Sequence, residues 1–512
     1  MSEDHTSTTS APEPSPVPGT AAYAQRAYEA DMTDDELVSS YGYTQQFART
    51  LRSFESFAVA FSFISITTGL FSTFGFVLGA GGPRGIWTWP IVVVGQVFVA
   101  LVYGMLASKI PLSGYSYQWA SRLANPRVGW WFGWVSFAFL SIVTVAVDYG
   151  LSQAALLPLF GIEFSPGKAM LVTLVVIVIQ AILIIWSTPI TAKINNWAVG
   201  AEVIGMVGLT LALLAAALFA GKGDWSQLGS TGVVAGAGYY GWLGPFMLAT
   251  LLGAYTIVGW ESASNLAEET HNPRQVVPRA MVRSILVAGG LGMLFLIVLV
   301  ATAHDIPALT GDSAPVATII GQNLGPVIKA IALVIVCVSI FACGLVIMVT
   351  NSRLIYSMAR DGRLPAAKVL TRVPRATGGP IWATLLAGGL SAAIVIGFGL
   401  NANALANLLG AATLMPAILY AGTVLLYWFT RNRIPARPGD FVLGRWEKPV
   451  VALALLWLAY ELVILIGPAD FRQAQYYAIG TLVVGALVYG GMLWKAPDAL
   501  RREPGLPGEG GR

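Results

Sequence analysis

The 512-residue chain is 56% hydrophobic and 11% charged, whereas soluble proteins are about 45–50% apolar and about 25% charged. This composition excludes an ordinary water-soluble enzyme and is typical of a chain whose surface faces lipid. The net charge of +4, from 30 basic and 26 acidic residues, is not gathered on one basic face, so we expect no nucleic-acid partner.

Motifs that would indicate an enzyme are missing from the sequence. It contains no phosphate-binding loop and no zinc-protease motif. Cys337 and Cys343 fall in one apolar run but point in different directions on a helix, which favours neither a disulfide nor a metal site. We therefore expect no enzymatic activity, no catalytic residue, no cofactor and no metal.

The chain begins with a polar tail and continues as a series of apolar stretches. We predict that residues 1–53 are a mostly disordered cytoplasmic tail, because the first part is rich in Ser, Thr, Pro and Glu. Twelve mostly apolar stretches follow, each long enough to cross about 30 Å of hydrocarbon as a helix. Their predicted extents are Glu55 to Ala80, Ile86 to Ser108, Trp130 to Leu157, Ala169 to Ser187, Trp197 to Ala220, Pro245 to Ala267, Ser284 to Ala303, Pro326 to Ser352, Ile381 to Phe398, Ala404 to Phe429, Val450 to Ile466 and Tyr477 to Trp494.

The basic residues between these stretches predict the orientation of the chain. If the N-terminus is cytoplasmic, only Arg84, Lys168, Lys222, Lys329 and Arg472 of the 30 basic residues fall on the outer side. Cytoplasmic loops carry an excess of Lys and Arg, so we expect both termini in the cytoplasm and a multi-pass protein of the inner or plasma membrane.

The first and sixth apolar stretches are interrupted at corresponding places. Glycine and β-branched residues weaken the helix at Ser65–Gly69 and again at Tyr255–Trp260. Unwound backbone in hydrocarbon persists only where it lines a cavity or binds something. Stretches one and six are five apart, as two inverted five-helix repeats require. Ordinary flexible helices with packing glycines remain the alternative.

Several short motifs add a resemblance to a known family. They are Tyr41-Gly42-Tyr43, Thr68-Gly69, Gly81-Gly82-Pro83, Glu268-Glu269-Thr270-His271-Asn272-Pro273 and the run from Arg353 to Pro365. In this order and spacing the chain resembles the amino acid, polyamine and organocation transporters, most nearly the amino acid/choline permease branch. Met105 and Tyr115 depart from the branch's pattern, on the cytoplasmic side.

The resemblance implies an all-α secondary transporter with twelve transmembrane helices and a leucine-transporter-like fold. Its five-plus-five inverted repeat would occupy residues 54–221 and 244–429. Two further helices at 449–494 and a cytoplasmic tail at 495–512 would follow. Substrate would then lie near the midplane, between broken spans one and six.

The two interruptions suggest a clamp for a zwitterion. Backbone N–H groups at the first break suit a carboxylate, because they lie at the positive end of a helix dipole. Carbonyls at the second break suit an ammonium group, which an aromatic face could cover; packing aromatics are the alternative. The expected substrate-binding residues are Ile66, Thr67, Thr68, Gly69, Tyr255, Ile257, Val258, Gly259 and Trp260.

Few ionisable residues lie inside the spans, and each is a functional candidate because charge at that depth costs at least about 2.5 kcal/mol. Glu202 in span five is the first candidate for proton coupling. It looks like the position where sodium-independent relatives carry a lysine, and a buried carboxylate favours its neutral form. Glu261 is the second candidate, by resemblance. Asp148 could contact an amine, whereas Glu461 is expected to be structural. For Glu202, contact with water or a basic neighbour is the alternative.

Basic residues also cluster after span eight. We expect them to anchor the cytoplasmic face to anionic lipid. A network of ion pairs between this cluster and Glu268 or Glu269, closing an inner gate, is the alternative. The cluster consists of Arg353, Arg360, Asp361, Arg363, Lys368, Arg372 and Arg375.

Together these patterns predict a secondary active transporter that imports an amino acid or related amine by proton symport, with protons and membrane lipid as its other partners. The alternatives are a choline, ethanolamine, polyamine or γ-aminobutyrate permease or exchanger. Sodium coupling, and a nutrient receptor that does not transport, also stay open, and the sequence does not indicate the oligomeric state.

Overall fold

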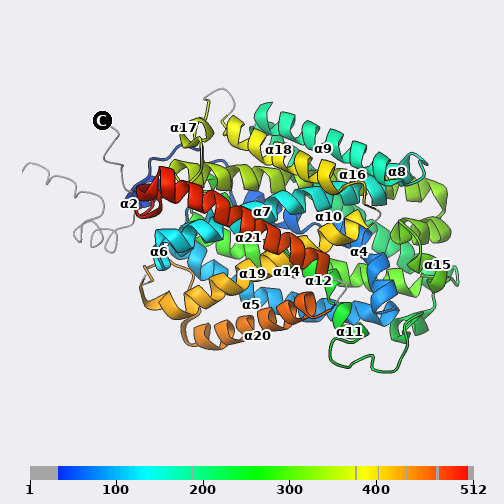
Figure 1. Ribbon diagram of the computed structural model, residues 1–512. Coiled ribbons are helices and arrows are strands. Elements are labelled where there is room, and N and C mark those ends of the chain that lie inside the picture. The colour runs from blue at the N-terminus through cyan, green and yellow to red at the C-terminus, as the bar shows by residue number, and fades with distance from the viewer. Residues whose placement is uncertain are drawn as a thin grey trace, which may run out of the picture.

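The protein is described by a computed structural model that covers residues 33–186, 188–374, 378–401, 403–433, 436–468 and 472–505. Those residues form a bundle of roughly parallel and antiparallel helices (Figure 1) and contain no strand, apart from an isolated bridge between Leu51 and Thr270. The all-α prediction is therefore confirmed.

The first half of the bundle contains the predicted spans one to five. The helices are α2 (Asp34–Ser40), α3 (Ser53–Ile64), α4 (Ile66–Ala80), α5 (Thr88–Lys109), α6 (Tyr115–Leu123), α7 (Pro126–Leu151), α8 (Leu157–Leu159), α9 (Pro166–Trp186) and α10 (Thr188–Phe219). The π-helical turn η2 (Ser152–Leu156) joins α7 to α8.

The second half contains the remaining spans and the C-terminal segment. Its helices are α11 (Pro245–Leu248), α12 (Leu251–Thr256), α13 (Ser262–Asn265), α14 (Pro273–Ala301), α15 (Ile306–Thr310), α16 (Pro315–Arg360), α17 (Ala367–Leu370), α18 (Ile381–Phe398), α19 (Ala404–Thr430), α20 (Glu447–Ile466) and α21 (Arg472–Lys495). Short 3-10 turns are η1 (Pro83–Trp87), η3 (Trp225–Gly229), η4 (Ala267–Glu269), η5 (Arg431–Arg433), η6 (Gly444–Trp446) and η8 (Pro497–Leu500).

Eleven helices among the described residues are long and apolar enough to cross a membrane. The sixth predicted span is not one of them, because it is divided into α11, α12 and α13. The count of twelve spans and the inverted repeat therefore stay predictions. The eighth predicted span lies in α16, which continues to Arg360, whereas the sequence predicts an end at Ser352. Arg353 and Arg360 therefore lie on this helix.

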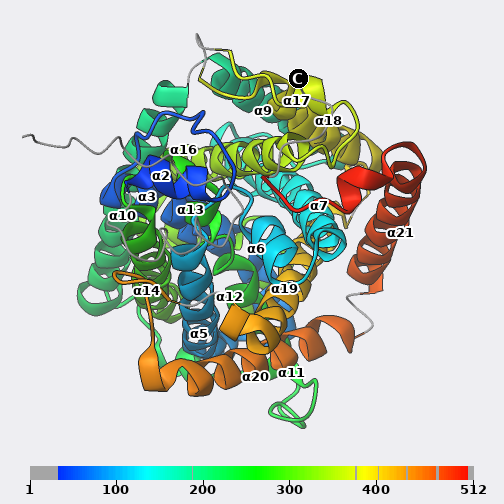
Figure 2. The same ribbon diagram turned by 90° about the vertical axis from the view of Figure 1, so that its left-hand side faces the viewer.

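The broken segments lie in the middle of the bundle. The first packs against α14, α10 and α16, and α12 packs against α4, α5 and α19. Viewed from one end, α3, α13 and α12 are surrounded by longer helices (Figure 2). We call the end that carries α2 and η8 the terminal face, and the end that carries α8, α11 and α15 the opposite face (Figure 1).

The predicted disordered tail is only partly within the described chain. Residues 1–32 lie outside the described residues, as do 506–512 of the C-terminal tail. In the rest of the N-terminal tail, α2 begins with a capping box in which Thr33 and Glu36 bond reciprocally. Leu37, Val38 and Phe47 are buried, so this part packs against the bundle.

Candidate functional site

The first broken span is interrupted at a single residue. Ser65 has φ 35° and ψ 95° and lies between α3 and α4. Its Oγ accepts a hydrogen bond from Thr68 N, and its carbonyl accepts one from Gly69 N. The predicted unwinding over Ser65–Gly69 is therefore too long, because serine capping lets α4 begin directly at Ile66.

Glu202 reaches the N-terminus of α4 from α10. Its Oε1 lies 3.0 Å from Thr67 N, 3.0 Å from Thr67 Oγ1 and 3.1 Å from Ser65 Oγ, all of which can donate to it. The side chain is 1% exposed, and no described ion pair includes it. The alternative expectation, that Glu202 reaches water or a basic neighbour, is wrong.

This contact changes the expected role of the first break. The N–H groups of Thr67, Thr68 and Gly69 were expected to be open to a substrate carboxylate, but all three already have acceptors. The positive end of the α4 dipole would stabilise an anion, and in this conformation the chain's own Glu202 carboxyl group occupies that position.

The second break lies between α12 and α13. Gly259 has φ +89°, and a Cβ there would lie 1.7 Å from Phe63 Cδ1, so only glycine fits. The Gly259 carbonyl accepts from Ser262 N. Among the described backbone hydrogen bonds, none is accepted by the carbonyls of Ile257 and Val258. The expected role of these two carbonyls in binding an ammonium group stays a prediction.

A tyrosine from α19 stabilises this break. Tyr420 Oη donates to Glu261 Oε2 at 2.7 Å and accepts from Gly259 N at 3.3 Å. Sequence reasoning found Glu261 but missed Tyr420, because a tyrosine in an apolar run has no local signal that distinguishes it from a packing residue. Only the fold brings α19 to the break.

The two aromatic candidates differ in their surroundings. The Trp260 ring packs against Tyr103 and Tyr420, with centroids 5.1 and 5.2 Å away, and it is fully buried. It therefore corresponds to the packing alternative in this conformation. Tyr255 is 6% exposed, and its hydroxyl has no hydrogen-bond partner among the described residues. The expected role of Tyr255 in substrate binding stays a prediction.

The two broken spans touch each other directly. A Cβ on Gly69 would lie 1.9 Å from Thr256 Oγ1, so glycine permits α4 and α12 to pack closely. A bulkier residue at Gly69 would separate the two spans whatever the substrate is. Substitution of Gly69 therefore tests how closely the two spans pack and does not identify the class of substrate.

Two other buried carboxyl groups form no described hydrogen bond with the breaks. Asp148 Oδ1 accepts from Gln180 Nε2 at 2.8 Å, and no described hydrogen bond connects it with either break. Glu461 in α20 is 3.4 Å from Gln96 Nε2 of α5. The structure thus joins Glu202 and Glu261 to the breaks by hydrogen bonds, whereas the described side-chain partners of Asp148 and Glu461 are glutamines of neighbouring helices.

Buried ion pairs lie between the breaks and the terminal face. Arg353 Nε lies 2.6 Å from Glu269 Oε1. Arg360 bonds to both carboxylate oxygens of Glu268, at 2.9 and 3.0 Å. These pairs join the end of α16 to η4, and we call them the terminal gate.

Asp361 also belongs to the terminal gate, and no described ion pair joins it to an arginine. Tyr43 and Tyr117 both donate hydrogen bonds to its carboxylate. Burial raises the pKa of Tyr43 to about 12, so this hydroxyl keeps its proton and remains a donor. The N-terminal segment is thereby tied to the end of α16.

The expectation of a lipid anchor is wrong for the buried members of the arginine cluster. Arg353 and Arg363 are each 1% exposed, so they contact protein and not headgroups. Lys368 and Arg372 are exposed, and Arg375 lies outside the described residues. The ion-pair alternative describes the helical part of the cluster, because α16 continues past Ser352 and carries its arginines into the bundle.

A cavity lies between the breaks and the opposite face. This cavity of about 220 Å³ is lined by Ser72 of α4, Leu251 of α12, Gln153 of η2 and Asn407 of α19. Ser72 lies in the second turn of α4, and Leu251 is the first residue of α12. Ser72 and Leu251 bring this cavity onto the two helices that begin or end at the breaks, α4 and α12.

Comparison with known proteins agrees with this architecture. A family model for amino acid permeases matches residues 51–489. The chain belongs to the amino acid permease family. The permease is thus a multi-pass membrane transporter of a small molecule and not an enzyme, and its resemblance to the amino acid, polyamine and organocation transporters is confirmed.

Curated relatives of the permease cover most of its length. An uncharacterized amino-acid permease of Schizosaccharomyces pombe is 28% identical, covering 89% of this chain and 85% of the relative. The amino-acid permease BAT1 of Arabidopsis thaliana is 26% identical over 81% of this chain and 85% of its own. A GABA-specific permease of Saccharomyces cerevisiae is 25% identical over 90% of this chain and 83% of its own length.

A solved structure supports the fold of the permease. A manganese transporter of Eremococcus coleocola, in complex with an aromatic bis-isothiourea compound, matches with a TM-score of 0.53. It covers 88% of this chain and 95% of its own. At 13% identity this likeness concerns the fold alone.

We predict that the Arg353–Glu269 pair is needed for transport. Removing one partner of a buried pair leaves an uncompensated charge at about 3–5 kcal/mol, so Arg353→Ala should lower initial uptake by more than about tenfold. Exchanging the charges, with Arg353→Glu and Glu269→Arg together, should restore part of the rate.

The exposed Arg49–Asp35 pair provides the control, because the Asp35 side chain is 69% exposed. Asp35→Ala should change uptake by less than about twofold. Radiolabelled uptake, normalised to the amount of each variant in the membrane, measures all four proteins. Equal losses for Arg353→Ala and Asp35→Ala would contradict the assignment of a gate.

Proposed function

We propose that the permease imports an amino acid or a related amine together with protons. The observation that carries this proposal is the Glu202 carboxylate at the N-terminus of α4, bonded to Thr67 and Ser65. A titratable group there can link the occupancy of the first break to the proton concentration.

Proton coupling follows from repulsion between two carboxylates. A substrate carboxylate that approaches the α4 N-terminus meets the negative charge of Glu202, and both compete for the same positive dipole end. Protonation of Glu202 removes that charge and weakens its hydrogen bonds with Thr67. Substrate then binds more tightly to the protonated protein, and by linkage the proton binds more tightly when substrate is present.

The ammonium group would lie at the second break. The free carbonyls of Ile257 and Val258 and the unpaired hydroxyl of Tyr255 support this placement. Glu261, held by Tyr420, lies one residue beyond Trp260 and is the second proposed proton site. Asp148 is retained as a weaker candidate for an amine contact, because one of its carboxylate oxygens has no partner among the described residues.

We place the terminal face in the cytoplasm of a cell bound by an inner or plasma membrane. The excess of basic residues on that side supports this orientation. Substrate would enter through the cavity at the opposite face, and the terminal gate would then open to release it. We expect the protein to have a five-plus-five inverted repeat with breaks in spans one and six. In such a fold, one group of helices moves relative to the other, and this movement would open the terminal gate.

A transported γ-aminobutyrate is the second candidate. The GABA-specific permease among the relatives favours it, and this molecule also carries one carboxylate and one ammonium group. Choline and polyamines have no carboxylate, so they would use the second break alone.

Uptake into proteoliposomes tests the proposed function. The purified permease would be offered labelled amino acids, γ-aminobutyrate, choline and a polyamine, with and without an inward proton gradient. About 100 mV and one pH unit together can sustain roughly a several-hundredfold accumulation. Accumulation of an amino acid that disappears with a protonophore is expected, and accumulation that survives it would overturn proton coupling.

A further inference from the structure

The C-terminal segment after α21 folds back across the terminal face. Residues 496–505, which we call the strap, include the turn η8 and end the described chain. Leu500 of the strap is fully buried, so the segment is docked and not merely trailing. In Figure 2 it runs from α21 past α7 toward the centre of the terminal face.

One side of the strap is held by the end of α16 and by α6. Arg363 donates from Nη2 to the Arg502 carbonyl at 2.8 Å, and from Nη1 to Ser121 Oγ at 2.9 Å. Arg122 Nη2 lies 3.4 Å from the Pro504 carbonyl. The buried Arg363 side chain therefore binds the strap to the region that follows the terminal gate.

The other side of the strap touches the N-terminal segment through two glycines. Gly42 and Gly505 have φ +81° and +86°. A Cβ on Gly505 would lie 2.0 Å from the Tyr41 carbonyl oxygen, and a Cβ on Gly42 would lie 2.2 Å from the Gly505 oxygen. The two backbones approach so closely that no other residue type fits.

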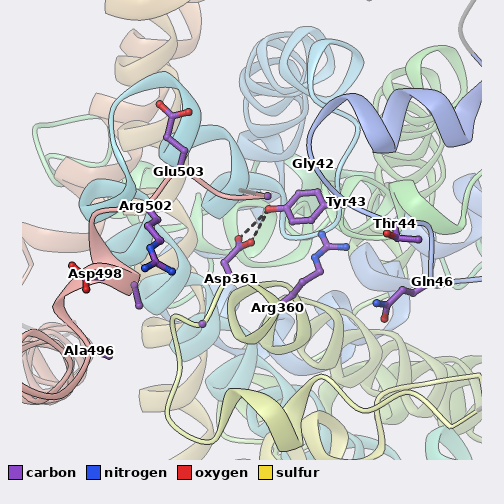
Figure 3. Close-up of a pocket in the computed structure, with 13 residues that line it drawn as sticks. Gly42, Tyr43, Thr44, Gln46, Arg360, Asp361, Ala496, Asp498, Arg502 and Glu503 are labelled. Atoms are coloured by element: carbon purple, nitrogen blue, oxygen red, sulfur yellow. Dashed lines mark hydrogen bonds between the residues drawn. The ribbon is translucent and has the colours of Figure 1, made fainter. Parts of the chain in front are cut away.

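The strap crosses a cavity and does not fill it. The cavity has a volume of about 610 Å³ and is lined by Tyr43, Arg360 and Asp361 on the gate side. Asp498, Arg502 and Glu503 line it on the strap side (Figure 3). Within the described chain, these three strap side chains form no ion pair. The strap is therefore held by the buried Leu500, by hydrogen bonds to its backbone and by the contact with Gly42, and not by ion pairs of these three side chains.

We propose that the strap is an autoinhibitory device that keeps the terminal gate closed. The gate joins the N-terminal segment and η4 to the end of α16, and these parts must separate when the terminal face opens. The strap contacts Tyr41 and Gly42 on one side and Arg363 on the other, so it opposes that separation. Anything that removes the strap favours the conformation open at the terminal face. This inference rests on the proposed transport cycle.

Two variants remove the strap in different ways. A chain that ends at Lys495 lacks it, and Gly505→Val places a branched side chain against the Tyr41 carbonyl. Gly444→Ala is the matched control, since Gly444 also has a positive φ of +54° but has open space around its Cβ. It shares the backbone strain without the contact.

The reporter is a single cysteine behind the gate. Val59 is 7% exposed and lines a small cavity together with Glu269 and Arg353. Val59→Cys, in a protein whose Cys337 and Cys343 are replaced by serine, would be labelled with a water-soluble maleimide in vesicles that expose the terminal face. Labelling needs neither substrate nor a proton gradient, so its outcome does not depend on whether proton coupling is correct.

Both strap variants should label about three- to tenfold faster than the parent, as expected when one or two hydrogen bonds that favour the closed state are lost. The Gly444→Ala protein should label at the parent's rate. If the truncated chain does not reach the membrane, Gly505→Val alone decides. Labelling of Gly505→Val at the rate of the parent and of Gly444→Ala would overturn the proposal.

Discussion

Replacing Gly259 with alanine should reduce uptake to the background of empty membranes. Gly259 lies in the second break with φ +89°, a conformation that residues with a Cβ rarely adopt, and its Cβ would overlap the ring of Phe63. The chain would have to move α12 and α13 away from α3. Strain and overlap together cost several kcal/mol, which is a loss of about a hundredfold or more.

Gly238→Ala separates the two contributions. Gly238 has a similar φ of +73°, but no atom lies within 4 Å of its Cβ, so it carries the backbone strain without the overlap. Initial uptake, normalised to protein in the membrane, should fall far less for Gly238→Ala. If Gly259→Ala transports as well as this control, the close packing of the two breaks is not required for function.

Glu202→Gln should abolish the accumulation of substrate against a gradient but preserve the exchange of substrate across the membrane. Glutamine keeps the size of the side chain and an oxygen that accepts from Thr67 N, but it cannot take up a proton. A transporter without its proton site can still move substrate in both directions, so it equilibrates and does not concentrate. We expect a fall from roughly a several-hundredfold ratio to about one for a zwitterion.

Glu461→Gln is the matched control for this experiment. Glu461 is also a fully buried glutamate within a span, but it lies in α20 against Gln96 and forms no described hydrogen bond with the breaks. Its substitution should preserve accumulation. Steady-state ratios and counterflow in proteoliposomes, with an imposed pH gradient, measure both properties. Accumulation by Glu202→Gln at the parent's level would exclude Glu202 as the coupling site.

Local sequence predicted the positions of the two breaks with fair accuracy. Gly259 and the Ser65–Gly69 run carry their information locally, because glycine and β-branched residues disfavour a helix wherever they stand. The length of the first break was overestimated, since the sequence alone did not indicate that Ser65 caps α4. The positions of the apolar helices along the chain also followed from composition. The exception is the sixth predicted span, which is divided into three short helices and does not form one long helix.

The contacts between distant segments could not be predicted in the same way. Glu202 was found as a buried charge, but its bonds to Thr67 depend on how α10 packs beside the first broken span. Tyr420 has no signal at all in its own apolar run. Arg353 appeared to be a surface residue because the predicted helix ended at Ser352. In each case the missing information was the packing of helices that are far apart in the sequence.

Protection of Cys343 by substrate tests the central claim most directly. Cys343 is fully buried in α16, and its Sγ lies 3.3 Å from the Phe63 carbonyl in the last turn of α3. In a Cys337→Ser protein, a small thiol reagent would report on the space beside the first break. A transported amino acid, at about ten times its Kd, should slow the reaction about tenfold, and an amino acid that is not transported should not. An unchanged rate with the transported amino acid would contradict a substrate site between the two breaks.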